Sequence, residues 1–365
     1  MSKTVYILGA GFSIEAGAPS QENLIKTIFE LSESPETPFH KKSIDEFAAF
    51  LTDVLLIPPD KHKSVPLEDI FTPIDRCLLD NVSFRNLDRD KIFQVRETVY
   101  YLIGLALEKK LKDTREDYVD KFAKFLVEQC QLRRTRKQFD PVAVLSTNWD
   151  ILLDNSLKSY IGERYLEDGV VDYCCYISSH KIDDGSVKPG LEKIGAGGFN
   201  VKLLKLHGSL NWLQCPRCSR VYVDFGRKIA IDHFHNPTPC RHCEKNFRST
   251  DKSMNLVSNL IMPTFLKNLS NPQYKLIWHN AGIELSEADR LVFVGYSLPQ
   301  ADFEMRQLLA RMVRGDASIE VVDYGDERDQ KVIDLKQRYS VFFGSRKIEF
   351  HLKGTKEFIN SHVDG

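Results

Sequence analysis

Short apolar runs that end in small or polar motifs recur along this 365-residue chain. The first covers residues 4–8 and continues into a Gly-Ala-Gly turn, and another covers 142–146 and continues into Thr-Asn-Trp-Asp. Further runs lie at 202–206, 290–294, 319–322 and 348–351. Helical stretches separate these runs, and this alternation is typical of parallel strands joined by crossover helices. The sequence therefore predicts an α/β fold with a parallel sheet.

The polar motifs stand at the carboxyl ends of the expected strands. After successive strands come Gly9-Ala10-Gly11, the segment with Asn148 and Asp150, His207, Gly295-Tyr296-Ser297 and Asp323. In open α/β sheets, ligands bind in the crevice outside these carboxyl ends. We therefore expect the motifs to converge on one binding site.

Each motif alone also has an interpretation that needs no ligand. The glycine turn could bring backbone N–H groups to a pyrophosphate, or it could only join a strand to a helix. Asn148 could orient a water or a ribose hydroxyl, whereas an Asx turn would have Asp150 cap the next helix. His207 suits general base work near neutral pH, although a single histidine is more often structural. The convergence of the motifs is what favours a functional site.

Four of the eight cysteines form two C-x-x-C pairs that are separated by 21 residues. Four thiolates at this spacing predict a closed, tetrahedral zinc site with a structural role. The expected ligands are Cys215, Cys218, Cys240 and Cys243. A histidine could replace one cysteine, and the candidates are His233, His235 and His242.

Charge and hydropathy exclude several classes of partner. The net charge is −1, with 50 basic and 51 acidic residues, so the composition shows no general attraction to nucleic acid or anionic membranes. No apolar run approaches the roughly 20 residues that a membrane helix needs, and the N-terminus does not read as a signal peptide. We expect a cytoplasmic protein with no membrane partner and no direct nucleic-acid binding.

In their order along the chain, the motifs resemble those of the sirtuin family. GAGFSIEAGAP is similar to the family's GAGxSxxAGxP loop, TNWD overlaps its T-Q-N-x-D segment in part, and LHGSL is similar to its catalytic His-Gly. The cysteine pairs begin eight residues after that histidine, as in the family's zinc module, and GYSL is similar to G-T-S-L. The resemblance implies a Rossmann-like NAD-binding domain over 1–212 and 251–365, with a helical insertion at 41–138, and a zinc-ribbon module at 213–250.

The resemblance also implies a role for each motif in cleaving the nicotinamide–ribosyl bond of NAD⁺. Asn148 and Asp150 would face the nicotinamide ribose, with His207 as the base. The other cofactor-binding positions lie along the diphosphate and the adenosine ribose. They are Gly9, Ala10, Gly11, Ser13, Gly295, Ser297 and Asp323.

Three departures from the family pattern bear on the reaction. Ser20-Gln21-Glu22 stands where the family has Asp-Phe-Arg, Thr147 replaces a glutamine, and LIMPTFLKN replaces the stretch that binds an acyl-lysine peptide. This pattern resembles the sirtuin-like proteins of prokaryotic antiviral defence. It implies an NAD⁺ hydrolase that forms a homo-oligomer, with a HerA-like DNA-translocating ATPase as a partner. The alternatives are an NAD-dependent protein lysine deacylase and a non-catalytic sensor of NAD⁺ or ADP-ribose.

Overall fold

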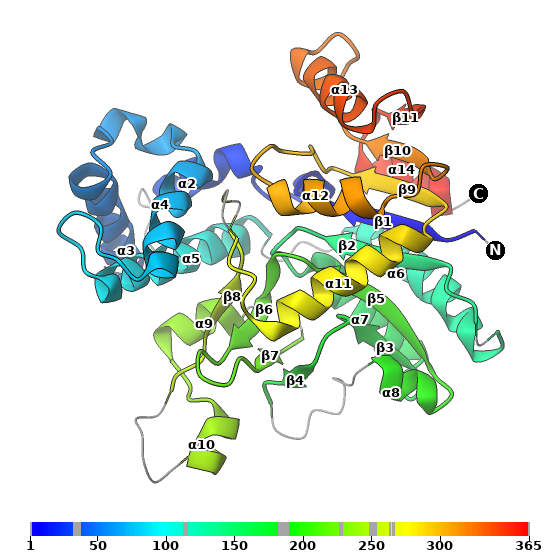
Figure 1. Ribbon diagram of the computed structural model, residues 1–365, viewed down its shortest axis with the longest axis horizontal. Helices are drawn as coiled ribbons and strands as arrows, with labels where there is room; N and C mark the ends of the chain where they lie inside the picture. The colour runs from blue at the N-terminus through cyan, green and yellow to red at the C-terminus, as the bar shows by residue number, and fades with distance from the viewer. Residues whose placement is uncertain are drawn as a thin grey trace.

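A central sheet of seven parallel strands forms the core of the computed structural model (Figure 1). The model describes residues 2–31, 38–111, 116–136, 138–181, 190–225, 229–247, 254–262, 264 and 267–363. The strand order is β11-β10-β9-β1-β2-β5-β3. The bounds are β1 Thr4–Leu8, β2 Val142–Ser146, β3 Gly169–Asp172, β5 Phe199–Lys205, β9 Arg290–Val294, β10 Ser318–Val322 and β11 Ile348–His351. The prediction of a Rossmann-like α/β fold is confirmed.

The strand β1 lies at the centre of this sheet, between β2 and β9. On one side of β1 lie β2, β5 and β3, and on the other lie β9, β10 and β11. The strand order therefore reverses at β1, which is where open α/β sheets bind ligands. The sequence did not predict β3, which pairs with β5 at one edge.

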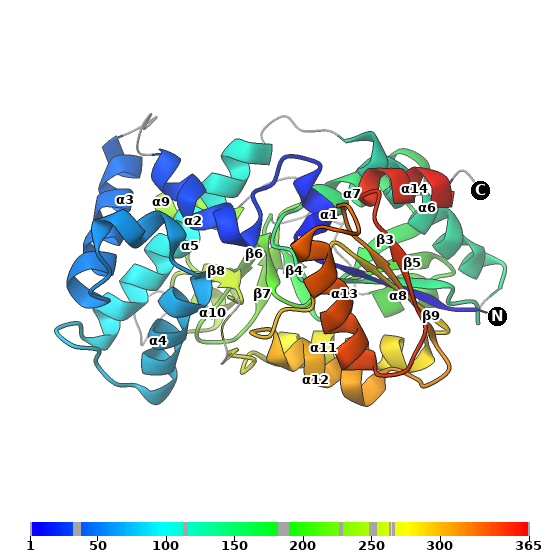
Figure 2. The same ribbon diagram turned by 90° about the horizontal axis from the view of Figure 1, so that it is seen from above.

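Helices cover both faces of the sheet (Figure 2). Tyr6 of β1 packs against Phe122 and His362 on one face, whereas Phe293 of β9 packs against Tyr339. The first face carries α6 Asp117–Cys130, α7 Leu152–Arg164 and α14 Thr355–Val363. The second face carries α11 Pro272–Glu287, α12 Phe303–Met312 and α13 Gln330–Phe343.

A helical block with its own hydrophobic core lies at one end of the molecule (Figure 1). It comprises α2 Gln21–Glu30, α3 Pro38–Ala49, α4 Leu67–Asp80 and α5 Arg89–Leu111, with short π- and 3₁₀-helical turns at 50–54 and 59–64. In α5, residues 99–107 are buried without interruption, because neighbours surround this helix on all sides. The helix α6 packs with the sheet instead, although it falls within the predicted insertion at 41–138. That division of the chain stays a prediction.

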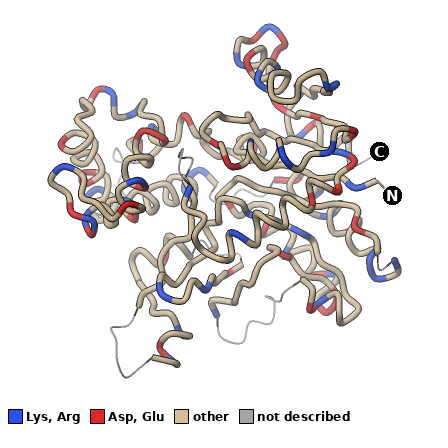
Figure 3. The backbone as a smooth tube through the Cα atoms, viewed as in Figure 1, with Lys and Arg blue, Asp and Glu red and all other residues tan. Residues whose placement is uncertain are grey.

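A second, four-stranded sheet adjoins the central one and carries the cysteine pairs. Its order is β4-β7-β6-β8, with β4 Ile177–Ser179, β6 Gly208–Gln214, β7 Val221–Val223 and β8 Val257–Leu260. Shorter helices complete the fold: α1 Gly11–Ile14, α8 Gly190–Gly195, α9 Ile229–His235 and α10 Arg241–Phe247. Basic and acidic residues are mixed along the described chain (Figure 3). No helix in the described ranges has the length and apolarity to cross a membrane.

Candidate active site

A cavity of about 300 Å³ lies at the carboxyl edge of the central sheet. Except for Gly9, every residue predicted to contact the ligand or perform the chemistry lines it. These are Ala10, Gly11, Ser13, Asn148, Asp150, His207, Gly295, Ser297 and Asp323. The topology therefore brings together motifs that are hundreds of residues apart, and the ligand role of each stays a prediction.

The glycines of the first and fourth motifs bring two loops into backbone contact. The Gly11 N–H donates to the Gly295 carbonyl over 2.9 Å. A Cβ on Gly11 would lie 2.5 Å from the Gly295 Cα, and one on Gly9 would lie 2.5 Å from the Gly295 carbonyl oxygen. Gly295 itself has a φ of 60°. These glycines therefore hold the two loops together, which explains why Gly9 lies behind the cavity wall.

Most N–H groups of the glycine loop are used inside the protein. Those of Gly9, Gly11, Phe12 and Ser13 donate to backbone carbonyls. Among the described residues, the backbone N–H of Ala10 has no such partner, and neither has that of Ser297 on the facing loop. Both residues line the cavity. An anionic ligand would therefore find few backbone donors here rather than a whole ring of them.

Asn148 ties the end of β2 to the glycine loop. Its Nδ2 donates to the Gly9 carbonyl over 2.8 Å, and its backbone N–H donates to the Ser146 hydroxyl. The carbonyl of Gly9 accepts only, which fixes the orientation of the amide. In the part of the chain that the structure describes, Oδ1 of Asn148 accepts no hydrogen bond. That oxygen is therefore available to a water or a ribose hydroxyl.

Asp150 caps a helix and also belongs to the cavity. Its Oδ1 accepts from the Leu152 N–H at the start of α7, so the Asx-turn interpretation is confirmed. Its Oδ2 accepts from the Ser13 hydroxyl over 2.8 Å. Beneath it, the buried Lys205 donates to the Asp150 carbonyl and pairs with Asp154. Two hydrogen bonds hold the carboxylate and a third holds the backbone carbonyl, which leaves the residue little freedom to move.

His207 lies between β5 and β6, separated from the end of β5 by one residue, and is only 6% exposed. Gly208 after it has a φ of 76°, and a Cβ there would overlap the Asn259 carbonyl and the Tyr274 hydroxyl. The chain therefore needs glycine to turn from the central sheet into β6 at this point. The imidazole lies near the Trp278 ring, with centroids 6.4 Å apart.

Asp302 is the side chain that sequence reasoning missed at this site. It precedes α12, lines the cavity, and places its Oδ1 3.4 Å from Nε2 of His207. Tyr296 donates to its Oδ2 over 2.7 Å, and Nζ of Lys267 lies 3.0 Å from its Oδ1. Burial raises the pKa of Asp302, but the charges of His207 and Lys267 and these hydrogen bonds outweigh burial and hold it well below its usual range. Asp302 is therefore a buried, ionised carboxylate beside the predicted base.

A second groove continues the cavity past Asp323. The two share Glu22, Ser297, Pro299 and Asp323, and the groove has a volume of about 530 Å³. The cavity and the groove are therefore continuous along these four residues. Burial raises the pKa of Asp323. The hydrogen bond from the Tyr324 N–H and the charge of Arg338 lower it again, but only in part.

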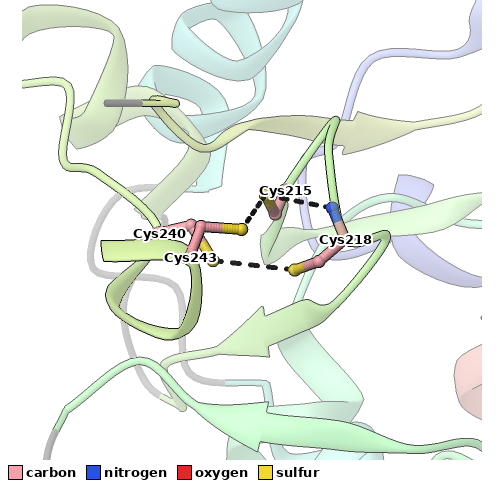
Figure 4. A group of neighbouring side chains, drawn as sticks. All are labelled: Cys215, Cys218, Cys240 and Cys243. Carbon is pink, nitrogen blue, oxygen red and sulfur yellow. Dashed lines mark hydrogen bonds between the residues drawn. The ribbon is translucent and has the colours of Figure 1, made fainter. Parts of the chain in front are cut away.

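The four cysteines of the C-x-x-C pairs meet between β6, β7 and α10 (Figure 4). Their Sγ atoms all lie within 4.8 Å of one another, with 3.7 Å between Cys215 and Cys243 and between Cys218 and Cys240. A tetrahedral zinc with Zn–S bonds of about 2.3 Å spaces its sulfurs by about 3.8 Å. The cluster therefore fits zinc.

The groups around the sulfurs change the thiol pKa values in opposite directions, and burial raises those of Cys215 and Cys243. Burial raises the pKa of Cys240, but hydrogen bonds from the Tyr222 hydroxyl, the Cys243 backbone and neighbouring thiols outweigh it and lower the value to about 7. Among the described residues, the alternative histidine ligands are not in the cluster. His233 bonds to the Leu256 carbonyl, and His235 bonds to Tyr101.

Comparison with known proteins returns similarity only at the level of solved structures. No family model and no curated protein matches the chain. A Sir2–p53 peptide–NAD⁺ complex shares 13% identity over 99% of this chain and 92% of that chain, with a TM-score of 0.42. A Sir2 homolog–NAD complex shares 14% over 100% and 89%, with a TM-score of 0.41. The fold assignment rests on the strand order and parallel register given above.

Proposed function

We propose that this protein is an NAD⁺ hydrolase that releases nicotinamide and ADP-ribose. One observation carries the proposal: Asn148 and His207 line the same cavity as the glycine loop, at the point where the strand order reverses. Support also comes from the ordered resemblance of the motifs to sirtuins.

A dinucleotide would extend over both the cavity and the adjoining groove. The cavity and the adjoining groove share four residues, so the nicotinamide half would lie at His207 and the adenosine half toward Asp323. The cavity wall carries four carboxylates and, among the described residues, no lysine or arginine. Backbone amides such as those of Ala10 and Ser297 would then meet the diphosphate, rather than cationic side chains.

The proposed reaction is a displacement at the anomeric carbon of the nicotinamide ribose. A water held by Oδ1 of Asn148 attacks this carbon while its bond to the nicotinamide nitrogen breaks, and nicotinamide leaves as a neutral molecule. His207 takes the proton, either from the water or through a ribose hydroxyl. The carboxylates in the wall, Asp150 among them, would stabilise the positive charge that develops on the ribose. General base catalysis of this kind is worth roughly 10²–10⁴-fold.

Incubation of the purified protein with NAD⁺, followed by quantification of nicotinamide and ADP-ribose, tests the proposal. Asn148→Ala and His207→Ala should each lower nicotinamide release by roughly 10²-fold or more. Asn155→Ala and His279→Ala are matched controls, because both positions are exposed and lie outside the cavity. Full activity in both site variants, with thermal melting unchanged, would refute the assignment.

The same assay separates the other two candidate functions. A lysine deacylase would depend on an acyl-lysine peptide and would form O-acyl-ADP-ribose. A sensor would be stabilised by NAD⁺ or ADP-ribose without releasing nicotinamide. NAD⁺ hydrolysis in the absence of any peptide favours the hydrolase over both.

The resemblance further supports a role as a cytoplasmic effector of anti-phage defence through NAD⁺ depletion. In this proposal the cysteine cluster holds a structural zinc, and the helical block serves assembly into a homo-oligomer, with a HerA-like ATPase as a partner. Phage challenge of cells that express the protein or its His207→Ala variant, with cellular NAD⁺ measured, tests the biological role. Mass photometry of the purified protein tests the assembly.

A further inference from the structure

His207 and Asp302 face each other in a buried part of the cavity wall. Their side chains are 7% and 4% exposed, and the Nε2–Oδ1 distance is 3.4 Å. That distance is longer than a well-formed hydrogen bond, and within the described part of the chain neither atom makes another one of good geometry. Catalytic hydrogen bonds are often long in a protein without its ligand and shorten when the substrate binds.

Asp302 is itself fixed from two sides. The Tyr296 hydroxyl bonds to Oδ2, and Nζ of Lys267 lies beside Oδ1. The Lys267 side chain is fully buried, and it also pairs with Glu304 over 2.9 Å. A buried carboxylate stays ionised only when it is paired in this way.

When the His207 ring is neutral, the ionised state of Asp302 determines its tautomer. An ionised carboxylate has no proton to give, so the imidazole nitrogen that faces it must carry one. With the proton on Nε2, the neutral ring keeps its lone pair on Nδ1. That nitrogen is then the proton acceptor.

We infer that Asp302 is a positioning residue that holds His207 in its Nε2–H tautomer, and that Lys267 offsets the charge of Asp302. The inference rests on the proposed NAD⁺ hydrolysis, in which His207 is the base. Without Lys267, the carboxylate would favour the protonated imidazolium, which cannot act as a base. Among the described residues, Asp302 lies beside His207 and Lys267 lies beside Asp302. Glu304 bonds to Lys267. The other carboxylates that line the cavity are Glu22, Asp150 and Asp323.

Two substitutions should move the acid limb of the kcat/KM profile in opposite directions. Asp302→Asn removes a negative charge beside the imidazole, so the acid limb should move to lower pH. Its kcat should fall by about 10- to 100-fold, with KM little changed, because the tautomer is no longer fixed. Lys267→Gln removes the offsetting cation, so the limb should move to higher pH.

Tyr296→Phe is the matched control, because it removes a hydrogen bond to Asp302 and leaves all charges in place. It should change neither the position of the acid limb nor the tautomer. Shifts of the same sign in Asp302→Asn and Lys267→Gln, or no shift in either, would overturn the inference.

¹⁵N NMR of the His207 ring reads the tautomer without any enzyme activity. The wild-type protein should show the Nε2–H form, assigned by comparison with His207→Gln, and Asp302→Asn should show a mixture. A wild-type Nδ1–H form would overturn the inference even if the enzyme hydrolyses NAD⁺. Absence of nicotinamide release from the wild-type protein would instead refute the proposed function, while the NMR result would still decide the role of Asp302.

Discussion

The four-cysteine cluster and the sheet-edge cavity both gather side chains at one point, but they are assembled differently. The cluster takes two pairs, each from a single tight turn, and all four ligands lie within residues 215–243. The cavity takes groups from loops that follow β1, β2, β5, β9 and β10. The positions of the cysteines depend on local turn geometry, whereas the positions of the cavity residues depend on the order of the strands in the sheet. The two regions should therefore respond differently to substitution.

Loss of a cysteine ligand should have the largest effect on stability. Structural zinc contributes roughly 10–16 kcal/mol in zinc-finger peptides, and this energy depends on all four ligands. Cys240→Ser should therefore lose bound zinc and melt at a clearly lower temperature. Mass spectrometry of metal content and calorimetry measure the two effects.

The half-buried Cys175 lies outside the cluster, so Cys175→Ser is the control and should retain the metal. A wild-type protein without zinc, or a Cys240→Ser variant that melts normally, would contradict the assignment of the cluster.

Among single substitutions at the cavity, Gly208→Ala should lower the stability of the fold most. The new Cβ would meet the Asn259 carbonyl, and the positive φ is unfavourable for alanine. We expect a loss of more than about 3 kcal/mol in the free energy of unfolding, measured in urea. Gly162→Ala in α7 is the matched control, because nothing lies within 4 Å of its Cβ. That change should be neutral or stabilising by up to about 1 kcal/mol.

The contrast between the two regions also explains what the sequence could predict. C-x-x-C spacing marks a metal site locally, and the four cysteines are the ones that meet in space. Strand-end motifs predicted most of the cavity, because parallel strands present their carboxyl ends on one edge. The strand β3 was missed, since only Val170 and Val171 are apolar in it and a glycine and an aspartate flank them.

Asp302 and Lys267 could not be found by the same reasoning. Asp302 lies seven residues beyond Gly295, at the start of a helix, where an acidic residue is ordinary. Lys267 follows the cysteine module and carries no motif. Both are recognised only by burial, by the distance from Asp302 to His207 and by the distance from Lys267 to Asp302, which depend on tertiary packing.

Asp75 offers a comparison from outside both regions. It lies on α4 in the helical block, is 8% exposed, and has Arg96 no closer than 3.9 Å. Burial raises its pKa to about 6, and Arg96 and a hydrogen bond with Thr264 offset this only in part. Asp302 has closer partners, and its pKa is lowered instead of raised.

The sign of the resulting pH dependence follows from linkage. The pKa of Asp75 is higher in the folded than in the unfolded protein. Its contribution to the free energy of unfolding is therefore fully present below about pH 4 and is lost as pH rises through about 6. The stability of wild type relative to Asp75→Asn should therefore fall by on the order of 2 kcal/mol between pH 4 and pH 7.5. Urea unfolding of both proteins at the two pH values measures this. A constant difference would show that folding does not raise the pKa of Asp75.

Ser13→Ala should give the smallest effect and tests whether the polar groups of the cavity hold one another. The hydroxyl donates to Asp150 over 2.8 Å, and Asn148 lies 3.4 Å from it. Since Asp150 borders the cavity, water can replace the lost donor, so we expect a destabilisation of only about 1 kcal/mol and a modest fall in nicotinamide release. Ser64→Ala, at an exposed serine that bonds to the Lys61 carbonyl, is the control. A loss from Ser13→Ala as large as that from Gly208→Ala would mean that this side-chain network, rather than the backbone packing of the glycine loops, determines the shape of the cavity.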